Sequence, residues 1–162
     1  MKSHTMIIMI IVAIALILIG VFFLWHIVLS QNANPPLTKG KVTIGATTFS
    51  IELATTTMEK MRGLSYRTGL AEGTGMLFTF TPGVQNFWMK DMNFPIDIIW
   101  IAGGKVAGFA ENAAPQPGAR LWELAIYTSP DGVDKVLEVN AGVVAKDNIK
   151  VGDTVTESGG ME

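Results

Sequence analysis

The stretch FWMKDMNFPIDIIWI, residues 87–101, places charged side chains inside one of the most apolar segments of the chain. We expect it to contain the end of one core strand, a turn marked by Pro95, and a second strand over residues 96–101. A buried charge costs free energy unless it is paired. Lys90 and Asp97 therefore either form part of a structural ion pair or mark a surface that binds a ligand.

The segments on either side have the short apolar runs and turn residues of a β-rich domain. The pattern predicts three hairpins, over residues 41–54, 75–89 and 96–112. It also predicts a short helix over residues 140–148 and two further strands, over residues 135–139 and 149–155. Strands at such short intervals imply a mainly β fold with some α structure. The predicted architecture is a small closed or half-closed antiparallel barrel with one or two short helices.

One of these helices has a sequence signature at its start. Thr56 and Glu59 have the spacing of a capping box, which predicts a helix over residues 57–64. A helix of about two turns is not stable alone. Its apolar side chains are therefore expected to pack on the sheet: Met58, Met61 and Leu64.

The N-terminal end of the chain is the most apolar part. From Met6 to Leu24 there are nineteen residues without a charge, a helix of roughly 28 Å, close to the hydrocarbon thickness of a bilayer. We predict a transmembrane anchor over residues 1–29 that contacts the membrane through residues 6–29. A cleaved signal peptide stays open as the alternative, although its apolar region is normally about 7–15 residues long. Lys2 favours a cytoplasmic N-terminus, and hence a single-pass protein of the cell membrane with an extracytoplasmic domain.

The rest of the chain is predicted to have three parts: a linker over residues 30–40, the β-rich domain over residues 41–156, and a disordered tail over residues 157–162. The formal net charge of the whole chain is −2, and there is no cysteine. The absence of cysteine excludes disulfides, thiolate zinc sites and cysteine nucleophiles. A mildly acidic chain without a basic run argues against nucleic-acid binding.

Eight short segments occur in an order that carries a resemblance: MRGLSYR (61–67), GMLFTF (75–80), FWMKDM (87–92), PIDIIWI (95–101), ENAAP (111–115), YTSP (127–130), VLEVNAG (136–142) and IKVGD (149–153). Together they resemble the family called DUF192, or UPF0127, over roughly residues 41–156. The resemblance implies a small β-rich fold, often behind a signal peptide or a membrane anchor. It implies no activity, since the family is known mainly as a domain of unknown function.

Within these segments the resemblance singles out an Arg-Gly-Leu element at residues 62–64, a Phe-Trp-Met-Lys element at residues 87–90, and a Pro-x-Asp element at residues 95–97. This chain has Asp91 and Met92 where Asn-Thr is common in the family. A role that needs an amide or a hydroxyl at those two positions is therefore not expected here.

The charged and aromatic residues near these elements form the candidate binding site: Arg62, Trp88, Lys90, Asp91, Asp97, Glu111 and Asn112. In one interpretation, Arg62 and Lys90 hold an anionic group in a small pocket between the helix and residues 87–101. In the other, Asp97 pairs with Arg62 or Lys90 and joins the helix to the sheet. Both interpretations stay open.

The favoured function is a non-catalytic binding or accessory module of the cell envelope. Its ligand would be a small anionic molecule, a sugar or a peptide, and Trp122 in the loop 113–130 is a further aromatic candidate for that contact. No cofactor and no metal ligand are assigned.

Two alternatives remain. A hydrolase-like enzyme would use carboxylates such as Asp91, Asp97 and Glu111 together with the cations of the same cluster. A Cu(I) site would use thioethers and an aromatic ring: Met76, Trp88, Met89 and Met92.

Overall fold

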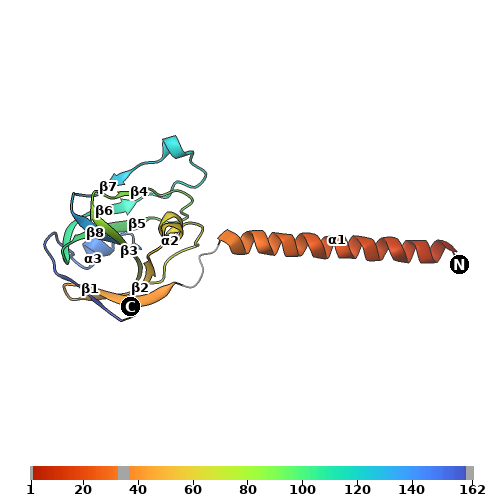
Figure 1. Cartoon of the computed structure of the whole chain (residues 1–162), viewed down its shortest axis with the longest axis horizontal. Helices are drawn as coiled ribbons and strands as arrows, with labels where there is room; N and C mark the ends of the chain where they lie inside the picture. Colours follow the sequence, from red (N-terminus) through yellow and green to blue (C-terminus); the bar gives the residue numbers. More distant parts are fainter. Residues whose placement is uncertain (1, 33–36, 160–162) are drawn as a thin grey trace. The chain divides into compact units, whose positions relative to one another are not determined.

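The computed structural model describes residues 2–32 and 37–159. It divides into two units, Met1–Ala33 and Asn34–Glu162 (Figure 1). The first unit is one helix, α1 (Lys2–Asn32). Its residues Met6–Leu24 have a mean hydropathy of 3.4 and are not buried against protein, so by length and composition the helix can cross a membrane.

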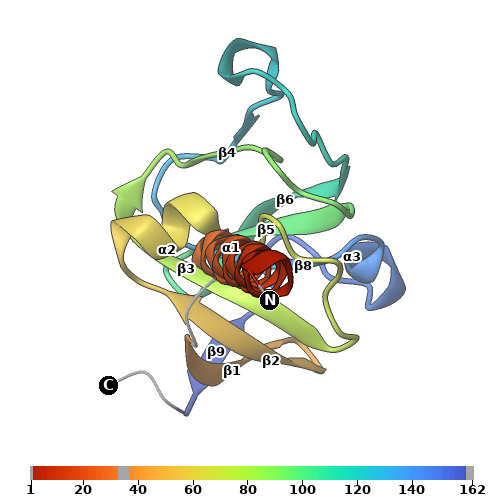
Figure 2. The ribbon, with the colours of Figure 1, turned by 90° about the vertical axis from the view of Figure 1, so that its right-hand side faces the viewer.

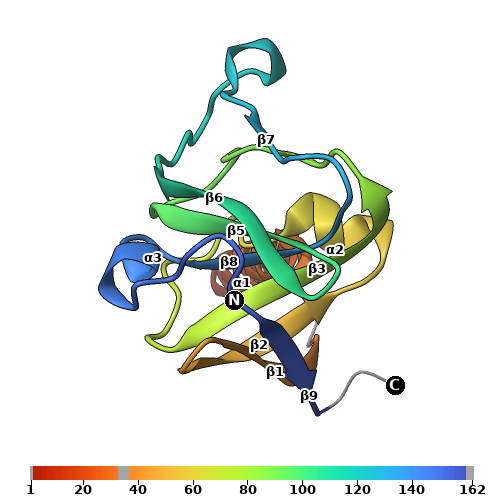
Figure 3. The same ribbon diagram turned by 90° about the vertical axis from the view of Figure 1, so that its left-hand side faces the viewer.

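The second unit is a seven-stranded sheet in the order β6-β5-β8-β3-β2-β1-β9, with a separate two-stranded sheet, β4-β7 (Figures 1 and 3). The strands are β1 (Thr38–Ile44), β2 (Thr47–Ala54), β3 (Thr74–Gly83), β4 (Asn86–Phe87), β5 (Ile96–Ala102), β6 (Lys105–Ala113), β7 (Tyr127–Thr128), β8 (Val133–Asn140) and β9 (Val155–Ser158). The short helices are α2 (Thr57–Arg62), the 3-10 helix η1 (Leu121–Glu123) and α3 (Val143–Lys146).

The large sheet curls until its two edges meet at one end, which confirms the predicted mainly β, half-closed barrel. The amide of Val106 in β6 donates to the carbonyl of Asp153 at 2.9 Å, and the amide of Val155 in β9 donates to the carbonyl of Gly104 at 2.8 Å. One neighbouring pair in the large sheet, β2 with β3, is parallel, because the chain crosses over through α2 between these strands.

Two of the three predicted hairpins are confirmed, β1-β2 and β5-β6. The third, over residues 75–89, is wrong. Both edges of β3 are already occupied, by β2 and β8, so the chain after Gly83 has no place beside it. It leaves the sheet instead, and Asn86–Phe87 pair with β7.

The predicted segment boundaries at the two ends of the domain also need correction. The predicted linker, residues 30–40, overlaps α1, which continues to Asn32, and β1, which starts at Thr38. Within the predicted disordered tail, Glu157 and Ser158 belong to β9 and pair with β1. Residues 33–36 of the linker and 160–162 of the tail lie outside the described residues.

The sheet has apolar residues on both faces. The inner cluster fills the barrel: Val42, Ile44, Phe49, Ile51, Leu53, Leu77, Ile99, Ile101, Val106, Leu137, Val139, Val144, Ile149 and Val155. The outer cluster lies on the other face: Leu37, Ala54, Leu64, Met76, Phe78, Met89, Met92, Ile96, Ile98, Trp100, Ala113, Val133 and Val136. Among the described residues α1 adds none to either cluster, so residues 37–159 have a core of their own.

The helix α2 covers the outer face in a different way from the prediction. Its capping box is present as expected, since the Glu59 amide donates to Thr56 Oγ1 at 3.2 Å and Glu59 Oε2 accepts from the Thr56 amide at 2.8 Å. Leu64, just after the helix, is buried on the sheet. Met58 and Met61, however, are 67% and 63% exposed, so the prediction that they pack on the sheet is wrong.

Asp97 lies on the inner face of β5 and is fully buried. Its Oδ1 accepts from the backbone amide of Asn112 at 2.8 Å, and its Oδ2 accepts from the amide of Val144 at 2.9 Å. Among the described residues these amides, and neither Arg62 nor Lys90, are the hydrogen-bond partners of the carboxylate. Asp97 therefore joins β5 to the end of β6 and to α3, which is a structural role.

We expect Asp97→Asn to reduce the free energy of unfolding by about 2–4 kcal/mol, because an amide has one acceptor oxygen and leaves one buried N–H unpaired. Urea unfolding of residues 34–162, followed by tryptophan fluorescence, measures this. Asp153→Asn is the matched control, since Asp153 accepts from the Lys150 amide in an exposed turn. Equal effects of the two substitutions would contradict the structural role of Asp97.

Candidate functional site

A cavity of about 170 Å³ lies between α2 and the outer face of the sheet. It is lined by residues from α2 and the turn after it, from β3, from residues 86–92 and from β8: Lys60, Met61, Arg62, Gly63, Leu64, Ser65, Phe78, Phe80, Asn86, Phe87, Trp88, Met92 and Glu138. This is the place where the sequence predicted a pocket, between the helix and residues 87–101.

The walls of the cavity are mainly aromatic. The ring of Phe87 makes edge-to-face contacts with Phe78 and Phe80, with ring centroids 5.3 and 5.9 Å apart. Phe78 and Phe80 project from the same side of β3, because side chains two residues apart share a face. The segment after β3 then turns back and lays Phe87 over them. Trp88, the next residue, is 42% exposed.

Two cations belong to the last turn of α2 and line the same cavity. Lys60 Nζ lies 4.7 Å from the centroid of the Phe80 ring, a cation–π contact at the wall. Arg62 is the last residue of the helix. Gly63 follows with φ of 48°, and a Cβ there would lie 3.5 Å from the Phe78 ring. Glycine thus gives the positive φ that lets the chain turn away from the helix toward Leu64.

Glu138, on the central strand β8, is the most unusual residue of the cavity. It is 6% exposed and stands between Met76 of β3 and Ile98 of β5 on the outer face. Among the described residues its Oε2 has no hydrogen-bond partner. Burial raises the pKa of Glu138 to about 8, against a smaller opposing effect of the Arg67 guanidinium. The carboxyl group is therefore largely protonated at neutral pH and can both donate and accept a hydrogen bond.

Glu138 is not among the site residues predicted from the sequence. It occurs in the run KVLEV, and alternation in β8 places Leu137 and Val139 inside the barrel and Glu138 on the opposite face. A single carboxyl in the middle of an apolar strand is the same type of signal that singled out Lys90. What the sequence did not show is that the outer face of β8 is also covered.

The predicted site residues separate into four places. Arg62 and Trp88 line the cavity. Asp97 lies on the other side of the sheet, where the backbone of Asn112 is its partner. Glu111 is exposed on β6. The structure does not bring these residues into one cluster.

Lys90 and Asp91 form the fourth place, together with Tyr66. The Lys90 ammonium makes an ion pair with the Asp91 carboxylate, and the Tyr66 hydroxyl donates to Asp91 Oδ2 at 2.7 Å. These contacts lower the pKa of Asp91, with Lys90 the largest cause, and raise the pKa of Lys90 and of Tyr66. Lys90 thus pairs with its own neighbour and not with Asp97.

The backbone around this Tyr66–Lys90–Asp91 cluster joins the turn after α2 to the segment that covers the cavity. The Tyr66 amide donates to the Asp91 carbonyl at 2.9 Å, and the Ser65 hydroxyl donates to the Lys90 carbonyl at 2.9 Å. Tyr66 and Asp91 both have positive φ values, 66° and 57°. Non-glycine residues in this conformation persist where surrounding contacts fix them.

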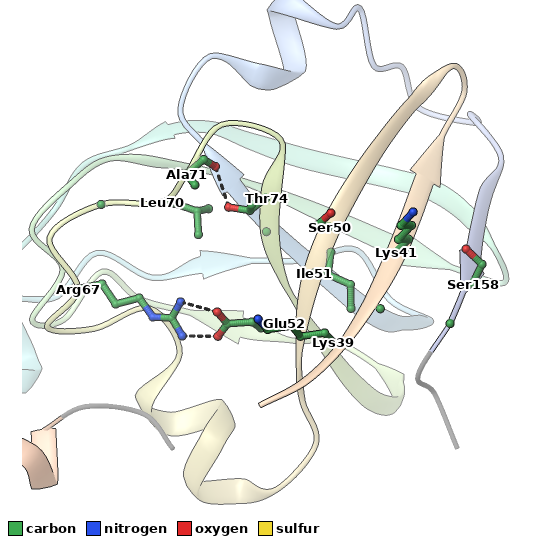
Figure 4. A pocket seen from close by; sticks show the side chains of 14 residues that line it. Lys39, Lys41, Ser50, Ile51, Glu52, Arg67, Leu70, Ala71, Thr74 and Ser158 are labelled. Carbon is green, nitrogen blue, oxygen red and sulfur yellow. Dashed lines mark hydrogen bonds and ion pairs between the residues drawn. The ribbon is translucent and has the colours of Figure 1, made fainter. Parts of the chain in front are cut away.

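A larger hollow of about 760 Å³ lies beside β1, β2 and the end of β9 (Figure 4). Figure 4 shows Arg67 held by Glu52, with Nη1–Oε1 and Nη2–Oε2 distances of 3.1 and 2.5 Å. Lys39, Lys41 and the hydroxyl-bearing residues Ser50, Thr74 and Ser158 are also part of its lining. It is wider, but it contains no buried polar group without a partner among the described residues.

The methionines of the copper alternative are buried in the outer cluster: Met76, Met89 and Met92. Met92 also lines the cavity. Within the described residues no group of three or more His, Cys, Asp or Glu side chains is placed to hold a metal ion. That finding does not test a thioether site, so the copper alternative stays a prediction.

Comparison with known proteins identifies the class to which this domain belongs. Residues 40–157 match DUF192, a family described as "Uncharacterized ACR, COG1430". The chain therefore belongs to the DUF192 family, as the sequence segments indicated. No curated protein matches it.

Two solved structures are similar over the domain. One is a protein of unknown function from Novosphingobium aromaticivorans DSM 12444, with 32% identity, a TM-score of 0.68, and coverage of 76% of this chain and 91% of that chain. The other, from Sinorhizobium meliloti 1021, is described as a "putative transcription regulator". It has 31% identity, a TM-score of 0.68, and coverage of 77% of this chain and 98% of that chain.

The raised pKa of Glu138 predicts a pH dependence of stability. Because the folded pKa lies above the ordinary value of 4.5, the folded state holds a proton that the unfolded state releases between these values. Stability is therefore expected to fall as pH rises from about 4.5 to about 8, by at most about 1.4 kcal/mol per pH unit. Glu138→Gln should remove this slope in urea unfolding of residues 34–162. An unchanged slope would contradict the burial of an unpaired carboxyl.

Proposed function

We propose that the chain is a membrane-anchored binding protein whose domain lies on the extracytoplasmic side. Its site is the cavity between α2 and the outer face of the sheet. The ligand is a small molecule with an anionic group and a neutral hydroxyl or amide. The observation that carries the proposal is the buried carboxyl of Glu138, which lines an open cavity and has no described hydrogen-bond partner for Oε2.

The family segments support this choice of cavity. All of its lining residues except Lys60 and Asn86 come from four of the segments that define the resemblance: MRGLSYR, GMLFTF, FWMKDM and VLEVNAG. These segments are far apart in the chain, and the fold brings them together at this place. The wider hollow of Figure 4 draws most of its residues from outside the segments.

The chemistry of the lining suggests the kind of ligand. A protonated carboxyl can exchange two hydrogen bonds with a hydroxyl or an amide, and a ligand that supplies them removes the cost of an unpaired buried group. The aromatic walls offer faces to the apolar C–H groups of such a molecule. Lys60 and Arg62 favour an anionic group at the same site. A small anionic polyol has all three features.

The same lining favours binding over hydrolysis. Among the described residues that line the cavity, Glu138 carries the one carboxyl group, whereas acid–base hydrolysis of the predicted kind needs two within reach of one bound molecule. Asp91, Asp97 and Glu111, the carboxylates of the enzyme alternative, all lie outside the lining.

The membrane part of the proposal is supported by the apolar length of Met6–Leu24. The extracytoplasmic side is supported by Lys2 before the span, since positive charge is retained in the cytoplasm. A net charge of −2 gives no reason to propose a nucleic-acid ligand.

The proposal is tested by NMR of residues 34–162 labelled at the methionine methyl groups. Small sugar phosphates and hydroxy acids, with glycerol 3-phosphate as the first probe, are expected to shift the methyl signals of Met61 and Met92. The Met58 signal is the internal control, because Met58 shares α2 with Met61 but does not line the cavity. If no member of this probe series shifts Met92, the proposed function is wrong.

Two variants at one position separate binding from folding. Glu138→Gln keeps a neutral donor and acceptor and should bind the probe within about threefold of the wild type. Glu138→Leu should weaken binding at least tenfold, which corresponds to the loss of about 1.4 kcal/mol. It should not lower thermal stability, since an apolar group replaces an unpaired polar one. Wild-type affinity in Glu138→Leu would contradict the role of the carboxyl.

A further inference from the structure

We infer that the cavity binds the headgroup of an anionic phospholipid and that the cavity rim docks on the bilayer surface. The rim is defined here by Met58, Lys60, Met61, Arg62 and Trp88. This inference rests on the proposed function and adds the source of the ligand, which is the membrane itself.

The rim combines large exposed apolar side chains with cations. Met58 and Met61 are 67% and 63% exposed and lie one helical turn apart on the same face of α2, and Trp88 is 42% exposed. Lys60 and Arg62 stand beside them in the last turn of the helix. Two methionines and a tryptophan exposed next to two cations are typical of a surface that meets the interface of an anionic bilayer.

The cavity and its rim offer a partner for each part of an anionic phospholipid. The buried, protonated Glu138 suits a headgroup hydroxyl, the cations Lys60 and Arg62 suit the phosphate, and the apolar rim suits the acyl region. A cavity of about 170 Å³ accepts a small headgroup and not an acyl chain pair. A fully soluble ligand would give no reason for the exposed apolar side chains.

The bilayer is within reach of the domain through the chain itself. From Leu24, at the end of the apolar span, α1 continues for eight residues to Asn32, about 12 Å. The five residues 33–37 add at most about 17 Å. A membrane this close gives lipid headgroups a high effective concentration, so a weak headgroup contact suffices for docking.

A second exposed apolar surface competes with the rim for this role. It is the loop tip defined by Leu121, Trp122 and Ile126, which are 65%, 77% and 51% exposed. Figures 2 and 3 show η1 projecting away from the barrel. Arg120 lies over the Trp122 ring at 5.5 Å. The tip has no residue in the lining of the cavity, so it cannot select a headgroup, and the rim is the better candidate.

The natural chain has no cysteine, so one introduced thiol can be labelled without background. Met58→Cys places a spin label at the rim but outside the cavity lining, and Leu121→Cys places one at the loop tip. The full chain is reconstituted in vesicles of phosphatidylcholine, with or without phosphatidylglycerol. The accessibility of each label to oxygen and to a water-soluble nickel chelate gives its depth.

We expect the label at position 58 to be protected from the nickel chelate and exposed to oxygen in vesicles with phosphatidylglycerol, and less so in phosphatidylcholine alone. Lys60→Gln should reduce this lipid dependence, whereas Lys150→Gln, in the exposed turn before β9, should not. The label at position 121 should stay in water. A label at position 58 that is equally exposed to water in both kinds of vesicle overturns the inference. Insertion of the label at position 121 into the bilayer, in place of the label at position 58, also overturns the inference.

The soluble probe distinguishes this result from the proposed function. If glycerol 3-phosphate shifts the Met92 methyl signal while the label at position 58 stays in water, the cavity binds a soluble phosphate and membrane docking is wrong. If no member of the probe series shifts the Met92 signal and the label at position 58 stays in water, both the inference and the proposed function are wrong. If the reconstituted chain fails to remain with the vesicles at high salt, the membrane anchor itself is wrong.

Discussion

Burial of both faces of three adjacent strands, β3, β8 and β5, is the constraint on which the rest of this domain depends. The inner face packs inside the barrel, and the outer face is covered by Leu64 and by the segment that carries Met89 and Met92. Where both faces of these strands are covered, a charged residue has no side that faces solvent. It must find partners within the protein or remain unpaired at a cost of several kcal/mol.

Asp97 and Glu138 show the two outcomes of that constraint. Each lies on one of these strands, and each is almost completely buried. Asp97 receives a backbone amide on each oxygen, which fixes the end of β6 and α3. Glu138 Oε2 has no described partner, and its pKa is raised to about 8. A satisfied buried carboxylate is explained by the fold, whereas an unsatisfied one beside an open cavity needs an explanation in function.

The sequence predicted the parts of this structure that depend on local chemistry. The capping box at Thr56 and the β5-β6 hairpin follow from residues close together in the chain. The predicted hairpin is wrong at residues 84–89 for a non-local reason. The strands that pair with both edges of β3 are β2 and β8, and no pattern of neighbouring residues predicts this pairing. The burial of Glu138 could not be predicted for the same reason. The segment that covers this side chain comes from a different part of the chain.

The stretch at residues 87–101 divides its residues between the wall of the cavity and the contacts that hold the wall in place. Phe87, Trp88 and Met92 face the cavity, while Lys90 and Asp91 join the segment to the turn after α2. The Lys90–Asp91 contact lowers the pKa of the carboxylate and raises that of the ammonium, so near neutral pH both keep their charges. The stability given by Asp91 is lost only in acid, and that given by Lys90 only in strong base.

The Tyr66–Lys90–Asp91 cluster therefore holds the cavity wall with constant strength across the neutral range. The two histidines of the chain, His4 and His26, lie outside residues 37–159, so no imidazole titrates within the described domain. If the proposed ligand binds, the protein's own contribution to the pH dependence of affinity is expected from Glu138, because its pKa of about 8 falls near the neutral range. Deprotonation would remove its hydrogen-bond donor and place a negative charge beside the anionic ligand. Under the proposed function, one carboxyl group of the cavity, Glu138, would therefore set the protein's part of the pH response of binding, while the contacts that hold the wall keep their charges.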